Sequence, residues 1–210
     1  MIMSLPNLLT ISRIVSLPLF IGAFYLEEAV ANWVTFAIFV LAGLTDFFDG
    51  YFARAWKQQS NFGRFLDPVA DKLLIASAIV MLVAFDRIHG LTVLAALVIL
   101  CREILVSGLR EFLAQVRVSV PVSRLAKWKT AIQIVAIGCL LLGNAVPALP
   151  FGELGIASMW AAAILTLITG YDYFRSGLRH LLETQVKASD APKQVKQTNP
   201  VEPSKPAPGV

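Results

Sequence analysis

Apolar residues in this chain form six long stretches separated by short polar connections. The stretches cover residues 8–25, 33–56, 65–85, 91–113, 125–142 and 154–174. A helix of about 20 residues rises about 30 Å, which matches the hydrocarbon core of a bilayer. None of the stretches alternates between apolar and polar residues as a half-buried strand would. We therefore expect an all-α polytopic membrane protein with six transmembrane helices.

Composition supports a membrane protein rather than a soluble domain. Hydrophobic residues make up 57% of the 210 residues in a count without glycine, whereas soluble domains reach about 45 to 50% with glycine included. The final segment is polar, rich in proline and free of aromatic residues, so it cannot bury a core. We expect a membrane domain over residues 1–182 and a disordered tail over residues 183–210.

Charged residues in the connections predict the orientation. Basic residues gather in alternate connections, at Lys57, Arg64, Arg117, Arg124, Lys127, Lys129, Arg175 and Arg179. The other connections carry mainly acidic residues, with Arg87 as their single basic residue. Cytoplasmic loops are enriched in Lys and Arg, so both termini are expected in the cytoplasm. The net charge of +4 suits contact with anionic lipid headgroups, and we expect no nucleic-acid partner.

Four aspartates stand within or at the edge of the second and third apolar stretches. Asp46 and Asp49 are three residues apart, and Asp67 and Asp71 are four apart, so each pair shares one helix face. An ionised carboxylate inside a membrane helix is costly, which favours a functional role. The second helix descends to the cytoplasm and the third returns, so the pairs are expected at similar depth in a cytoplasm-facing polar cavity.

Carboxylates that converge in this way need cations to neutralise their repulsion. Oxygen ligands suit Mg²⁺ or Mn²⁺, and two such ions can stabilise both the attacking and the leaving oxygen of a phosphoryl displacement. A structural alternative is that Asp67 caps the third helix, with Pro68 at its first position. In that alternative the other aspartates form buried ion pairs with Arg54 and Arg64.

Small residues accompany the carboxylates. Gly50 and Ala53 continue the face of Asp46 and Asp49, and Gly63 precedes Asp67 by one turn. Small side chains let a ligand approach the helix backbone, although they also serve close helix packing. Arg54 suits a diphosphate clamp, or is a basic flank at the cytoplasmic end of its helix.

Together these residues spell D-x2-D-G-x2-A-R-x8-G-x3-D-x3-D from Asp46 to Asp71. The pattern resembles the signature of the CDP-alcohol phosphatidyltransferases at every fixed position. A chance match is on the order of 10⁻¹⁰ per starting position at ordinary residue frequencies. The segments LPNLLT with Arg13, CREILVSGLREFLA from Cys101 and SRLAKWKT from Ser123 resemble the branch that makes phosphatidylglycerophosphate. Ala126 stands where that branch usually has glycine.

The resemblance implies a six-helix homodimer of a bacterial cytoplasmic membrane, with its active site facing the cytoplasm. Such enzymes transfer the phosphatidyl group of CDP-diacylglycerol to an alcohol and release CMP. The resemblance assigns two divalent ions to Asp46, Asp49, Asp67 and Asp71, with Asp71 also the base that deprotonates the alcohol. It places Gly50, Ala53, Arg54 and Gly63 against CDP-diacylglycerol. Asn7, Thr10 and Arg13 either line the same cavity or anchor the first helix at the interface.

The expected acceptor is sn-glycerol 3-phosphate, whose phosphate needs fixed cations. The candidates lie towards the cytoplasmic half and are Arg102, Arg110, Lys127 and Lys129. The alternative is that they are ordinary basic residues at the cytoplasmic ends of their helices. Glu103 shares a helix stripe with Arg110, and in an alternative arrangement it pairs with Arg110 and holds it in position. Rival acceptors are phosphatidylglycerol, as in cardiolipin synthesis, and inositol phosphate, inositol or serine. A cation-coupled carrier is a further alternative, because buried carboxylates also mark ion pathways.

Overall fold

A computed structural model describes residues 5–55, 61–116 and 124–189, and all regular structure in these ranges is helical. The helices are α1 (Leu5–Ala23), α2 (Glu28–Ala55), α3 (Asn61–Ala84), α4 (Thr92–Gln115), α5 (Arg124–Leu142) and α6 (Phe151–Ser189). One helix corresponds to each apolar stretch, so the all-α prediction is confirmed. Residues 56–60, between α2 and α3, and residues 117–123, between α4 and α5, lie outside the described part.

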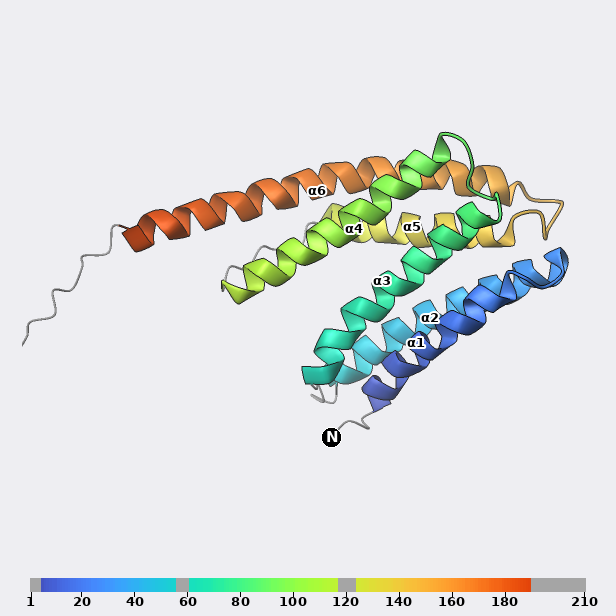
Figure 1. The fold of residues 1–210 in the computed structure, drawn as a ribbon, viewed down its shortest axis with the longest axis horizontal. Helices are drawn as coiled ribbons and strands as arrows, with labels where there is room; N and C mark the ends of the chain where they lie inside the picture. The colour runs from blue at the N-terminus through green and yellow to red at the C-terminus, as the bar shows by residue number, and fades with distance from the viewer. Residues whose placement is uncertain (1–4, 56–60, 117–123, 190–210) are drawn as a thin grey trace, which may run out of the picture.

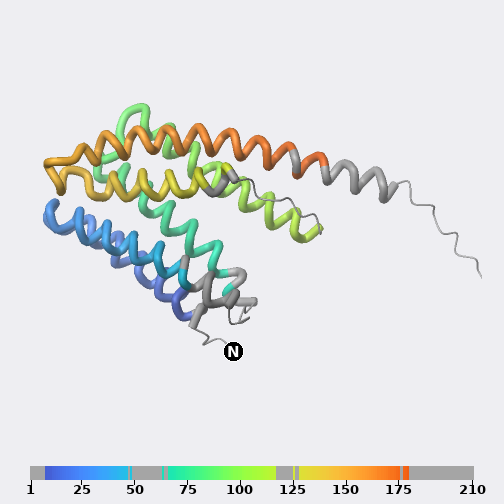
Figure 2. The backbone as a smooth tube through the Cα atoms, turned by 180° about the vertical axis from the view of Figure 1, so that it is seen from behind, coloured from blue at the N-terminus to red at the C-terminus, as the bar shows by residue number. Residues whose placement is uncertain are grey.

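Successive helices run in opposite directions, so the connections fall at two ends of the bundle (Figure 1). The α1–α2, α3–α4 and α5–α6 connections meet at one end, which we call the connection end. The first turns of α1 and α3 and the last turns of α2 lie at the other, the carboxylate end. α1 packs against α2 and α3, whereas α6 packs against α4 and α5. α5 also contacts α2 and α3 and joins the two groups, as Figure 2 shows from behind.

The apolar core lies between the helices in the middle and towards the connection end. Its fully buried side chains include Phe20, Leu82, Ile99, Ile137 and Met159. Large apolar residues also cover the outside, where Leu19 is 66% exposed and Ile104 is 69% exposed. An outer surface this apolar suits lipid rather than water.

Membrane-spanning stretches are apparent by length and composition in three of the described helices. They are Glu28–Asp46, Thr92–Gln115 and Phe151–Arg179, and shorter apolar segments occur at Leu8–Ala23 and Trp128–Leu142. The first half of α3 carries Asp67, Asp71 and Lys72, which lower its hydropathy. The structure thus supports a helical membrane protein, while six complete crossings stay a prediction.

α6 is much longer than its apolar stretch. Its 39 residues correspond to about 58 Å at 1.5 Å per residue, against a hydrocarbon core of about 30 Å. The helix reaches well beyond the other helices (Figure 1) and continues past the predicted domain boundary at residue 182 to Ser189. Residues 190–210, where most of the predicted disordered tail falls, lie outside the described residues.

Three residues with left-handed backbone, Asp86, Gly90 and Gly143, lie at the connection end. Gly143 follows α5 with φ of 49°, and its N–H donates to the carbonyl of Cys139 at 2.9 Å. This arrangement is a common way of ending a helix. Asp86, two residues after the end of α3, has φ of 57°, a region that aspartate and asparagine tolerate better than most residues.

Candidate active site

α1 joins the two helices that carry the aspartate pairs. Arg13 on α1 donates from Nη1 to Oδ1 of Asp46 on α2 at 2.7 Å. One turn earlier, the hydroxyl of Thr10 donates to Oδ1 of Asp67 on α3. Both α1 residues are almost fully buried, at 1% for Thr10 and 2% for Arg13. The structure therefore brings α1 to the carboxylates, as one of the two readings of these residues predicted.

The carboxylates themselves remain accessible. The side chain of Asp46 is 45% exposed, Asp67 is half-buried and Asp71 is exposed. Asp71 interacts electrostatically with Asp46 and Arg13, and also with Glu103 on α4. Members of both aspartate pairs thus lie near one another, and the cation of Arg13 bonds to one of them, Asp46.

The alternative in which Asp67 caps a helix is wrong. α3 begins at Asn61, so Asp67 and Pro68 lie inside the helix rather than at its start. The carboxylate of Asp67 bonds to Thr10 of another helix instead. The second part of that alternative, ion pairing with Arg54 and Arg64, involves side chains outside the described part.

Several predicted site residues have no described side chain. These are Asn7, Asp49, Gly50, Ala53, Arg54 and Lys127. On α2, Asp49 and Gly50 follow Asp46 by about one helical turn. Gly63 is described and buried on α3, one turn before Asp67.

The donor set has the chemistry of a site for hard divalent ions. Asp46, Asp67 and Asp71 offer carboxylate oxygens, which are the ligands that Mg²⁺ and Mn²⁺ prefer. Among the described side chains, no three of Asp, Glu, His or Cys lie close enough to hold one ion together. Asp49, the fourth predicted ligand, lies outside that set, so the metal site stays a prediction.

A second charged cluster lies between α4, α5 and α6. Glu103 on α4 accepts from the ammonium of Lys129 on α5, and Nη1 of Arg102 lies 3.4 Å from the same carboxylate oxygen. Nη2 of Arg102 donates to the hydroxyl of Thr169 on α6 at 3.2 Å. Lys129 is 3% exposed, so its charge depends on Glu103. The structure brings together two of the four predicted phosphate ligands, Arg102 and Lys129.

Of the other two predicted phosphate ligands, only Arg110 has a described side chain, and it contacts α6 rather than Glu103. Arg110 is exposed, and its guanidinium carbon lies 5.9 Å from the centre of the Tyr173 ring on α6. The alternative in which Glu103 pairs with Arg110 is wrong, because Glu103 pairs with Lys129 and Arg102. The side chain of Lys127 lies outside the described residues.

Two buried polar residues on the helices of this cluster were not predicted from the sequence. Gln133 follows Lys129 by four residues on α5, and Thr166 precedes Thr169 by three on α6. Both are buried, and neither Oε1 of Gln133 nor the hydroxyl oxygen of Thr166 has a hydrogen-bond partner in the described structure. Each is a polar residue within an apolar stretch, one helical turn from another polar or charged residue, and this spacing could have predicted them.

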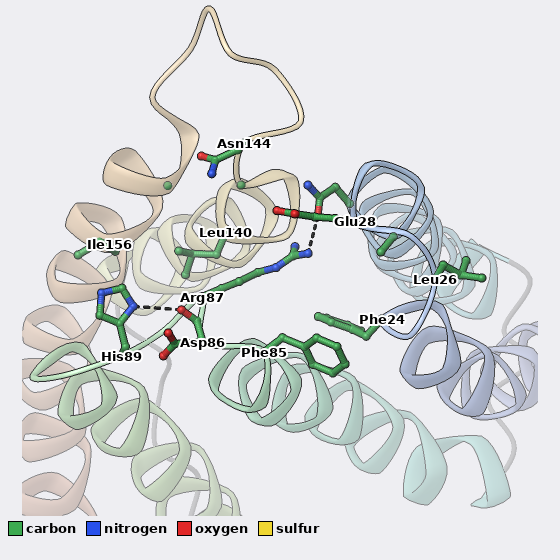
Figure 3. A pocket seen from close by; sticks show the side chains of 14 residues that line it. Phe24, Leu26, Glu28, Phe85, Asp86, Arg87, His89, Leu140, Asn144 and Ile156 are labelled. Atoms are coloured by element: carbon green, nitrogen blue, oxygen red, sulfur yellow. Dashed lines mark hydrogen bonds between the residues drawn. The ribbon is translucent and has the colours of Figure 1, made fainter.

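A cavity of about 580 Å³ lies at the connection end, lined by residues that include Phe24, Asn32, Arg87 and Asn144 (Figure 3). Arg87 reaches across it and donates to the carbonyl of Leu141 at 2.7 Å and to the side chain of Asn32. Its guanidinium also lies 5.7 Å from the centre of the Phe24 ring. Burial lowers the pKa of Arg87, and the nearby Glu28 opposes that shift. Arg87 thus ties three helix ends together, a structural role for the single basic residue of these connections.

Comparison with known proteins points to one family. The sequence profile described as CDP-alcohol phosphatidyltransferase matches residues 3–168. A Rickettsia felis protein named CDP-diacylglycerol–glycerol-3-phosphate 3-phosphatidyltransferase is 49% identical over 82% of this chain and 94% of its own length. Proteins with the same name from Cereibacter sphaeroides and Pectobacterium atrosepticum are 39% and 41% identical, over 85% and 86% of this chain and 97% and 98% of their own lengths.

Proposed function

Because the chain belongs to the CDP-alcohol phosphatidyltransferase family, we propose that it transfers the phosphatidyl group of CDP-diacylglycerol to sn-glycerol 3-phosphate. The products are phosphatidylglycerophosphate and CMP, in phospholipid biosynthesis. The names of the relatives support this choice of acceptor. The structural observation that carries the proposal is the contact of α1 with both halves of the signature, through Arg13 and Asp46 and through Thr10 and Asp67.

Asp46, Asp49, Asp67 and Asp71 would hold two divalent ions, which when bound neutralise the diphosphate as CMP leaves. The partial exposure of the described carboxylates supports access for ligands. Arg13 holds one oxygen of Asp46 and fixes its orientation. Thr10 does the same for Asp67. The carboxylate of Asp71 accepts the proton of the attacking hydroxyl. The new phosphorus–oxygen bond then forms as the bond to CMP breaks.

Small residues near the carboxylates make room for the cytidine nucleotide. Gly50, Ala53 and Gly63 allow the diphosphate to approach the helix backbones, and Arg54 supplies a positive charge to it. Asn7, one turn before Thr10 on α1, completes the proposed lining for CDP-diacylglycerol. The burial of Gly63 supports close approach of another group at this point of α3.

The acceptor phosphate is assigned to Arg102, Arg110, Lys127 and Lys129. Arg102 and Lys129 share one carboxylate, that of Glu103, which leaves the trio with one net positive charge. Lys129 also interacts electrostatically with Asp71. A phosphate held by this pair of cations would therefore lie close to the proposed base.

The protein is proposed to cross a bacterial cytoplasmic membrane several times, with both termini and the active site on the cytoplasmic side. The basic residues at the carboxylate end, such as Arg110 and Arg175, support this orientation. Homodimer formation is proposed from the family resemblance. The exposed apolar residues Ile104 and Leu105 on α4 are available to lipid or to a second copy.

The decisive experiment follows CMP release by purified protein in detergent with CDP-diacylglycerol, Mg²⁺ and a panel of alcohols. We expect sn-glycerol 3-phosphate to give much faster release than glycerol, inositol phosphate, inositol or serine. Faster release with phosphatidylglycerol would instead establish the cardiolipin-forming reaction. A protein that releases no CMP with any alcohol is not a transferase, and the carrier alternative would then stand.

A matched pair of variants tests the proposed base. Asp71→Asn should remove turnover while CDP-diacylglycerol still binds, because an amide fills the space but cannot accept the proton. Asp86→Asn is the control, since Asp86 is an exposed aspartate at the opposite end whose left-handed backbone suits asparagine. Near-normal turnover of Asp71→Asn at saturating Mg²⁺ would refute the assignment of the base.

A further inference from the structure

Three buried polar atoms on α4, α5 and α6, the helices that form the Glu103 cluster, have no hydrogen-bond partner in the described structure. They are Oε1 of Gln133, the hydroxyl oxygen of Thr166 and Nε of Arg102. Gln133 is 3% exposed and Thr166 is 0% exposed. Buried polar groups in folded proteins almost always find partners, because leaving one unpaired costs stability. These three atoms on helices that pack together are therefore candidates to bind a ligand that supplies their partners.

Thr166 differs from three other threonines of the described helices. The hydroxyls of Thr35, Thr45 and Thr169 donate to carbonyls three or four residues earlier in their own helices. Threonine in a helix adopts either a rotamer whose hydroxyl makes this bond or one whose hydroxyl does not. The hydroxyl of Thr166 makes no such bond. It is therefore available to a group outside its own helix.

The unpaired atoms lie next to the cations proposed to bind the acceptor phosphate. Gln133 is one turn from Lys129 on α5, and the two share a buried face. Thr166 is one turn from Thr169 on α6, and Thr169 accepts a hydrogen bond from Arg102. α5 and α6 pack side by side in both views of the bundle (Figures 1 and 2). Anion-binding groups and neutral hydrogen-bonding groups thus occupy neighbouring turns.

We propose that Gln133 and Thr166 bind the secondary hydroxyl of the acceptor and select a phosphorylated polyol over simpler phosphorylated alcohols. This inference rests on the proposed function, in which Arg102 and Lys129 bind the acceptor phosphate. A hydroxyl group both donates and accepts. It can donate to Oε1 of Gln133 and accept from the hydroxyl of Thr166. In sn-glycerol 3-phosphate the secondary hydroxyl lies between the phosphate and the reacting hydroxyl. The phosphate is proposed to bind Arg102 and Lys129, and the reacting hydroxyl is proposed to face Asp71.

The test compares sn-glycerol 3-phosphate with 3-hydroxypropyl phosphate, which lacks only the secondary hydroxyl. For the unmodified protein we expect kcat/KM to be about 10- to 100-fold higher with sn-glycerol 3-phosphate. Gln133→Met and Thr166→Val keep side-chain size and remove the polar atoms. Each should lower kcat/KM for sn-glycerol 3-phosphate about 10-fold or more and leave the value for 3-hydroxypropyl phosphate nearly unchanged.

Thermal stability without substrate gives an independent measurement. Because Oε1 of Gln133 and the hydroxyl oxygen of Thr166 have no hydrogen-bond partner in the described structure, both variants should be at least as stable as the unmodified protein. Thr35→Val is the matched control, since Thr35 is equally buried but bonded within its own helix. It should lower stability and leave the ratio of the two kcat/KM values unchanged.

Each other outcome overturns the proposal. Equal kcat/KM for the two acceptors in the unmodified protein would mean that the secondary hydroxyl is not recognised. Equal losses with both acceptors, or lower stability of Gln133→Met and Thr166→Val, would show that these residues bond to the protein or to fixed water. Absence of turnover with every phosphorylated alcohol would refute the proposed function itself. Turnover without selectivity would refute this inference alone.

Discussion

The ion pair of Glu103 and Lys129 should contribute to stability asymmetrically. The side chain of Lys129 is 4% exposed and that of Glu103 is 23% exposed. Removing one partner of a buried pair costs about 3 to 5 kcal/mol, because the other charge stays buried without compensation. Glu103→Gln leaves the buried ammonium of Lys129 without its carboxylate. We therefore expect this variant to lose about 3 to 5 kcal/mol of unfolding free energy.

Lys129→Met should cost less. It leaves Glu103 partly exposed, with Nη1 of Arg102 still 3.4 Å from its carboxylate, and it adds an apolar side chain to a buried position. We expect a loss of about 0 to 2 kcal/mol. The double variant Glu103→Gln/Lys129→Met should recover most of the loss seen in Glu103→Gln, since no buried ammonium remains.

Unfolding of the purified protein in mixed micelles with increasing SDS, followed by circular dichroism, measures these free energies. A double-mutant cycle then gives the coupling between the two residues. A smaller loss for Glu103→Gln than for Lys129→Met would refute the reasoning, because it would mean that the ammonium does not depend on Glu103. Additive losses in the double variant would refute it as well.

Three further predictions concern other parts of the bundle. Gly155→Ala places a Cβ 2.7 Å from Cγ of Leu140, so it should lower the unfolding free energy by about 1 to 3 kcal/mol; failure of Leu140→Ala to relieve the loss would contradict this clash. Arg87→Leu removes bonds to Asn32 and Leu141 at the connection end and should cost about 2 to 4 kcal/mol without changing KM for sn-glycerol 3-phosphate; a changed KM would mean that the connection end acts on the site. In a background with Cys101→Ala and Cys139→Ala, cysteine at exposed Ala148 should react with an impermeant thiol reagent in intact cells, and cysteine at exposed Gln115 should not; the reverse pattern would overturn the proposed orientation.

The sequence determined the helices and the signature because both depend on local order. Long apolar stretches predict helices whatever their neighbours are, since a helix satisfies its own backbone hydrogen bonds. Spacings of three and four residues place Asp46 with Asp49, and Asp67 with Asp71, on shared helix faces. Both properties are fixed within a single segment, and the predicted stretches each correspond to one observed helix.

Tertiary structure decided which of these faces meet. Glu103 could pair along its own helix with Arg110, and it pairs across helices with Lys129 instead. Thr10 and Arg13 could anchor α1 at the interface, and they contact Asp67 and Asp46 instead. Such choices depend on the rotation and axial position of each helix against its neighbours. Those are set by the packing of side chains distant in sequence, such as Gly155 against Leu140 and Gly170 against Arg102, and no local pattern encodes them.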